Sequence, residues 1–222
     1  LLRQLKLTVI SHLLQMEIKD IDKYRRTLFH ETGHYIARKL NLSIYKKGAG
    51  IKEIYIKEEK FTTNGLDYSG GATAKIPENY VDEGFIKDVP HYIAVIIYGC
   101  IIQVLYQRNF KNKKFRECFS LDNSAQGISD MDSFTRIGIE FTGPKRLKLV
   151  EYIENEYLDL IEENYKKLEK MVGKETFIFE KEGSKYILNL EQIDRLLEDF
   201  LISHTKYYKR FIKKIIEIKN DR

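Results

Sequence analysis

The spacing of apolar and polar residues predicts a chain made mostly of helices. Apolar residues recur at helical spacing from about Lys23 to Leu40, where Asp20 or Asp22 can cap the start and Asn41 can end the helix. The longest apolar run, Ile93 to Leu105, is typical of a buried core helix. Helices are also expected over residues 1–19, 84–108, 129–141, 145–172 and 191–219.

Two regions alternate in polarity and predict β-strands instead. The segment "IKEIYIKEE" (51–59) is followed by "GATAKI" (71–76), and turn signals lie at Asn64-Gly65 and Gly70-Gly71. A second hairpin, "TFIFEKEGSKYIL", is expected to turn near Gly183. The expected fold class is therefore mainly α (α+β), with a small β-hairpin or sheet after the first long helix and a long helical C-terminal part.

Length and composition favour one folded domain. The 222 residues fit a single domain whose core spans about 23–172, with residues 173–222 as an appendage. Hydrophobic residues make up 43% and charged residues 32%, which excludes an intrinsically disordered chain. The run from Ile93 to Leu105 is shorter than the about 20 residues that a bilayer requires, so no membrane span is expected. Cys100 and Cys118 lack Cys-x-x-Cys spacing, and we interpret them as reduced thiols in a cytoplasmic protein.

The mildly basic net charge of +5 is concentrated near the C-terminus. We interpret this concentration as the solvated face of the last helix and do not expect nucleic acid as a partner. A weaker alternative is a nucleic-acid binder that uses residues 204–222, for which binding would depend on salt. The basic residues concerned are Lys206, Lys209, Arg210, Lys213, Lys214, Lys219 and Arg222.

The motif "HETGH" in the first long helix indicates metal chemistry. His30 and His34 are four residues apart, so both imidazoles can face one ion from successive turns. Glu31 projects about 100° around the helix from His30 and can reach a water on that ion without binding the metal. This pattern predicts two zinc ligands and a general base for peptide-bond hydrolysis. Gly33, which costs ~1 kcal/mol within a helix, predicts a close backbone neighbour.

A catalytic zinc usually has a third protein ligand, and the residues alone leave that ligand open. Glu53, Glu58 and Glu59 lie in a predicted strand and are weak candidates. Asp130, at an expected loop-to-helix junction in "GISDMDSF", is a better one, although an aspartate there can also be an ordinary N-cap. Asp132 competes with it. The other histidines, His12, His91 and His204, are less attractive.

The sequence resembles the peptidase domain of the FtsH-type AAA zinc metalloproteases over roughly residues 23–170. The resemblance rests on "HETGH", on a short β segment, on "IYGCIIQVLY" as the apolar helix, and on "GISDMDSF", where Asp130-Met131 matches the family's Asp-Leu. It implies a zincin-like fold with Zn²⁺ held by His30, His34 and Asp130. The chain contains no Gly-x-x-x-x-Gly-Lys-Ser/Thr phosphate loop, so an ATP-independent peptidase is expected.

The segment "SGGATAKI" is a candidate substrate-binding edge strand. Gly70, Gly71, Ala72 and Thr73 would leave backbone groups open to a peptide or unfolded protein segment, although small residues also suit an ordinary hairpin that something packs against. A homo-oligomer or a separate partner protein stays open. The alternative function is a non-catalytic, zincin-like protein-interaction module. The intact set of His30, Glu31, His34 and Asp130 favours the enzyme.

Overall fold

A computed structural model describes residues 18–61, 65–75, 89–111, 114–120, 127–137, 141 and 143–221. The helix expected over residues 1–19 lies almost entirely outside this part of the chain. The described helices are α2 (Ile21–Leu40), α4 (Val89–Lys111), α5 (Phe115–Cys118), α6 (Ile128–Ile137), α7 (Gly143–Tyr152), α8 (Leu158–Val172) and α9 (Leu190–Asn220), with π-helical segments η1 (Asn41–Tyr45) and η2 (Ile153–Tyr157). The strands are β1 (Gly50–Phe61), β2 (Gly65–Lys75), β3 (Ile178–Glu182) and β4 (Lys185–Leu188). The mainly α (α+β) fold class is thereby confirmed.

The four strands form one antiparallel sheet in the order β2-β1-β4-β3. β1 pairs with β2 over its length and with β4 on its other side, where Tyr55 lies opposite Ile187. The expected hairpin at Gly183 is present, and this glycine has the left-handed φ of 61° that such a turn uses. Residues 173–222 are therefore not an appendage, because their hairpin completes the sheet that begins with β1. The turn expected at Gly70-Gly71 is wrong, since both glycines lie inside β2.

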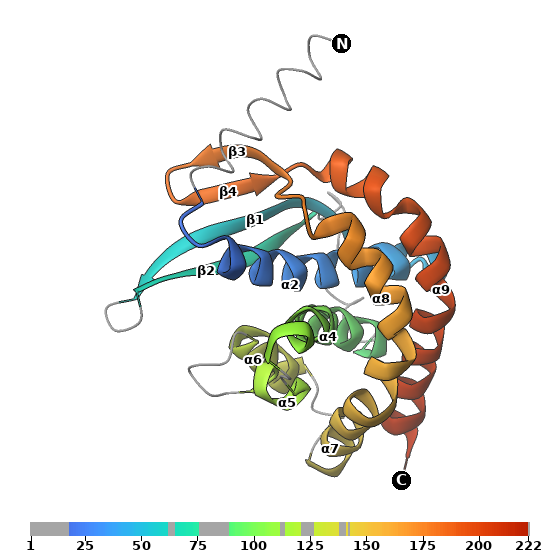
Figure 1. The fold of residues 1–222 in the computed structure, drawn as a ribbon. Coiled ribbons are helices and arrows are strands. Elements are labelled where there is room, and N and C mark those ends of the chain that lie inside the picture. Colours follow the sequence, from blue (N-terminus) through green and yellow to red (C-terminus); the bar gives the residue numbers. More distant parts are fainter. Residues whose placement is uncertain are drawn as a thin grey trace.

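Helix α2 lies between the sheet and α4 (Figure 1). Asp20 caps its start by accepting a hydrogen bond from the backbone N–H of Lys23 at 3.1 Å, as its position in the sequence predicts. Most sides of the helix are buried, and its own apolar residues, such as Leu28 and Ile36, lie in the core. A Cβ atom at Gly33 would lie 2.3 Å from the carbonyl oxygen of Tyr98, so the predicted close backbone neighbour is α4.

Helix α4 is the central core helix. Its segment Val89–Arg108 is the one described helix long and apolar enough to cross a membrane, but 78% of the apolar window is buried inside the fold. Partners from α2, α6, α8 and α9 surround it (Figure 1). The burial explains the apolar sequence as core packing, as expected for the run from Ile93 to Leu105.

The long helix α9 runs along α7 and α8 on one side of the molecule (Figure 1). Its apolar residues at helical spacing, including Leu197, Tyr208 and Ile215, join the core, and His204 is buried with them. The basic side chains Lys206, Lys209, Arg210 and Lys213 are exposed, in agreement with a solvated face.

Candidate metal centre

Three of the predicted site residues converge at one point. His30 and His34 lie on the α4-facing side of α2, and Asp130 comes from the first turn of α6. The two Nε2 atoms are 3.0 Å apart, and Oδ2 of Asp130 lies 3.0 Å from Nε2 of His30 and 3.5 Å from Nε2 of His34. Residues a hundred positions apart in the sequence therefore present three potential ligand atoms to one small volume.

The outer nitrogens of both imidazoles face acceptors, which fixes their tautomers. Nδ1 of His30 lies 2.8 Å from Oε1 of Gln103, whose amide group donates to Gln107. Nδ1 of His34 lies 2.7 Å from the carbonyl oxygen of Val95. Since a carbonyl oxygen only accepts hydrogen bonds, each Nδ1 carries the proton, and each neutral ring has its lone pair on Nε2. Such outer-shell hydrogen bonds orient histidine ligands in metal sites.

The arrangement requires a cation at its centre. Two imidazole lone pairs and a carboxylate oxygen repel one another unless a proton or a metal ion lies between them. Tetrahedral zinc with bonds of about 2.0–2.1 Å places its ligand atoms about 3.3–3.4 Å apart. The observed separations of 3.0, 3.0 and 3.5 Å agree with that geometry to within a few tenths of an ångström. The residues present thus fit zinc.

Without an ion, protons take the place of the metal. Burial lowers the pKa of His30 and of His34, but the adjacent Asp130 carboxylate outweighs it and raises both pKa values above the usual range. Burial alone would raise the pKa of Asp130, yet the two imidazoles hold it well below its usual range. A metal ion would compete with these protons, so binding of the metal should strengthen as pH rises.

Glu31 lies beside the ligand atoms, close enough to form a candidate metal-binding group with His30 and His34. Its carboxylate is buried, and one of its oxygens lies within 4.8 Å of the ligand nitrogens of His30 and His34. A Cβ atom at Gly70 would lie 2.4 Å from Oε1 of Glu31, so only glycine at this position of β2 leaves room for the carboxylate. Burial raises the pKa of Glu31, which suits a group that accepts and returns a proton.

The competing acids have other partners. Glu59 lines the same cavity but pairs with Lys57 and accepts a hydrogen bond from Ser69. Asp132 is about half exposed and pairs with Arg136 on the outer face of α6. Glu53 pairs with Lys185, and Glu58 accepts a hydrogen bond from Tyr186, so neither reaches the histidines. Asp130 is not the N-cap that its sequence position suggested, because α6 begins two residues earlier, at Ile128.

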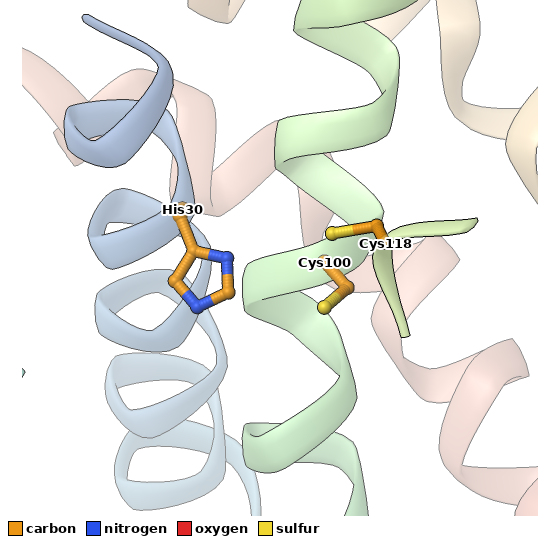
Figure 2. A group of neighbouring side chains, drawn as sticks. All are labelled: His30, Cys100 and Cys118. Atoms are coloured by element: carbon orange, nitrogen blue, oxygen red, sulfur yellow. The ribbon is translucent and has the colours of Figure 1, made fainter. Parts of the chain in front are cut away.

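The structure also brings together two cysteines that sequence reasoning did not connect. Cys100 on α4 and Cys118 on α5 are free and buried, as expected of reduced thiols. Their Sγ atoms lie within 4.8 Å of one another and of a His30 ring nitrogen, and Figure 2 shows the imidazole directed toward them. Sγ of Cys100 is 3.8 Å from Oδ2 of Asp130. The thiols therefore form a second candidate ligand set that shares His30.

A cavity of about 540 Å³ opens beside the three converging residues. The expected substrate strand lines it in part: Gly70, Gly71 and Ala72 form one wall, whereas Thr73 is exposed and does not line it. Among the described strands β2 pairs only with β1, so it is an edge strand. The small residues also have a packing reason, since a Cβ atom at Gly71 would lie 2.7 Å from the hydroxyl oxygen of Tyr55.

Three further residues shape the centre, and sequence reasoning missed all of them. Gln103 is a buried amide within the apolar run from Ile93 to Leu105, and that contrast was the available signal. Gly99 lies one turn before it, and a Cβ atom there would lie 2.4 Å from Nε2 of His34. Arg38 follows His34 by one turn of α2 and lines the cavity.

Comparisons of the chain with protein-family models, with curated proteins and with solved structures gave no match. The resemblance to FtsH-type peptidases therefore depends on the motif residues and their order along the chain.

Proposed function

We propose that this protein is a zinc-dependent metalloendopeptidase. One observation carries the proposal: two imidazoles with fixed tautomers and one carboxylate direct three ligand atoms at a single point, beside a buried glutamate. His30, His34 and Asp130 would hold the ion, which leaves a fourth coordination position for water or substrate, as in catalytic zinc sites.

Bound zinc would supply a Lewis acid that polarises the scissile carbonyl group and makes water more acidic. Glu31 would accept the proton of the attacking water and then deliver it to the leaving amine. The buried position of Glu31, with its raised pKa, favours both the uptake and the return of this proton.

The cavity wall supports a peptide as the proposed substrate. An extended peptide can add to an edge strand through main-chain hydrogen bonds, and β2 runs along the cavity where Glu31 lies. A short peptide or an unfolded segment of a protein fits this mode, since a folded chain has few free backbone groups.

The test is hydrolysis of a quenched-fluorescent peptide library by the purified protein loaded with zinc. A chelator should abolish cleavage, and added zinc should restore it. Glu31→Gln should keep the zinc but lose about 10²- to 10⁴-fold in rate. Glu59→Gln, which alters a carboxylate at the cavity wall that hydrogen-bonds Ser69, is the matched control and should retain activity. Cleavage that survives the chelator, or an active Glu31→Gln, would contradict the proposal.

The thiols offer a second way to bind the ion, and substitution separates the two. If zinc is held by His30, His34 and Asp130, then Cys100→Ala and Cys118→Ala should each retain one zinc per chain. Loss of zinc from these variants would assign the ion to the set of His30 and the two cysteines instead.

A further inference from the structure

The cavity contains a positively charged side chain, Arg38, for which the described part of the protein supplies no partner. Arg38 lies on α2, four residues after His34 and seven after Glu31, so it shares their face of the helix. It is partly buried, and its Nε atom is buried with no hydrogen-bond partner. It forms no ion pair with any described residue.

The acids that line the same cavity are already engaged. Asp67 pairs with Arg26, Glu59 pairs with Lys57, and Asp130 faces the two imidazoles. Glu31 acts on Arg38 only through its charge, and Arg38 is the single lysine or arginine among the described residues of the cavity wall. The cavity therefore holds one positive charge whose hydrogen-bonding capacity is unused within the described structure.

An unpaired guanidinium at such a place is costly, and a carboxylate ligand would offset that cost. Arg38 is partly buried, and this burial lowers its pKa because it removes part of the water around the charge. A guanidinium presents five N–H donors in a planar fork that matches the two oxygens of a carboxylate. Val95 and Ile96 of α4 form an apolar part of the cavity wall.

The position of Arg38 also fits a peptide that reaches the metal centre. Four residues of helix separate His34 from Arg38, which is about 6 Å along the axis. An extended peptide advances about 3.3–3.6 Å per residue. A carboxylate one or two residues from the bond at the metal would therefore come level with the guanidinium.

We propose that Arg38 binds a carboxylate of the substrate, either its C-terminal carboxylate or an Asp or Glu side chain, and so selects which peptide bond is cleaved. This inference rests on the peptidase function proposed above. Arg38 thereby acts as a specificity-determining residue, whereas Glu31 and the metal ligands act on the bond itself.

The test measures binding separately from cleavage, with zinc-loaded Glu31→Gln as the receptor. Fluorescent hexapeptides of one sequence are compared in anisotropy titrations: free C-terminus against C-terminal amide, and internal Glu against internal Gln. At least one charged form should bind about 10- to 100-fold more tightly than its neutral match, the range for a hydrogen bond to a charged group. The two pairs distinguish a terminal carboxylate from a side-chain carboxylate.

Arg38→Met, made in the same Glu31→Gln background, should abolish this preference and retain zinc content and thermal stability. Lys39→Met is the matched control. It removes a positive charge from the same turn of α2, but Lys39 pairs with Asp194 outside the cavity. Equal binding of charged and neutral peptides, or a preference that survives Arg38→Met, would overturn the proposal. If the wild-type protein cleaves none of these peptides but the Arg38-dependent binding preference is present, the peptidase proposal is contradicted. The carboxylate-binding site is then still supported.

Discussion

Two buried histidine clusters in this protein differ in what their nitrogens face. His204 of α9 lies with Nδ1 2.5 Å from Oδ1 of Asn164 and Nε2 2.5 Å from the hydroxyl oxygen of Tyr98. One nitrogen thus donates to an amide oxygen and the other accepts from a hydroxyl, so neutral partners satisfy the whole ring. Burial lowers the pKa of His204 to about 3, and no described carboxylate opposes that effect.

The cluster of His30 and His34 is satisfied only on its outer side. There the Nδ1 atoms are paired, while the Nε2 atoms face each other and the carboxylate of Asp130. The comparison shows that burial alone does not identify a ligand histidine. A set of convergent acceptors without a donor distinguishes a candidate ligand set, because a proton or a metal ion must lie between them.

The largest expected effect on this comparison comes from removal of the Asp130 carboxylate. Asp130→Ala should lower zinc affinity by more than ~100-fold, since loss of an outer-shell group alone costs 10–100-fold. Asp132→Ala, two residues away on the exposed face, should leave the affinity unchanged. Isothermal titration of the metal-free proteins with zinc provides the measurement, and equal losses in both variants would contradict the assignment.

A second substitution sharpens the role of the outer hydrogen bonds. Gln103→Leu removes the acceptor of the His30 Nδ1–H and should reduce zinc affinity by about 10- to 100-fold. Gln107→Leu should reduce the affinity less, because Gln107 contacts the amide of Gln103 and not the imidazole. An unchanged zinc affinity in Gln103→Leu would mean that packing, and not this hydrogen bond, orients the ring.

The fully hydrogen-bonded His204 predicts that the stability of the protein depends on pH. The pKa of His204 is depressed, so between about pH 6.5 and pH 3 the unfolded chain binds a proton that the folded chain does not. Stability therefore rises with pH across this window, by roughly 1.4 kcal/mol per pH unit for this group. Denaturant unfolding of the wild type and His204→Gln should show a shallower pH dependence in the variant. Parallel curves would show that the imidazole does not titrate on unfolding.

Local patterns were enough to predict much of this molecule. Helical periodicity located α2, α4 and α9, and the spacing of His30 and His34 predicted that both rings face one point. The assignment of Asp130 as the third ligand came from the resemblance, since an aspartate near a helix start is more commonly a cap.

The remaining features depend on contacts between different elements, which the periodicity of the sequence does not predict. Alternation predicted the hairpin near Gly183 but not its pairing with β1, because any strand edge offers the same backbone groups. Cys118 reaches His30 only because α5 packs against α4. Gly99 and Gly70 are required by side chains from another element, so their role emerges only in three dimensions.

The place of β4 beside β1 has a consequence for any shortened form of the protein. A fragment that stopped at Val172 would lose β3 and β4 and expose the backbone donors and acceptors of β1 from Tyr55 to Lys57. Such an unprotected edge recruits strands from other molecules, so the fragment would aggregate before it could be assayed.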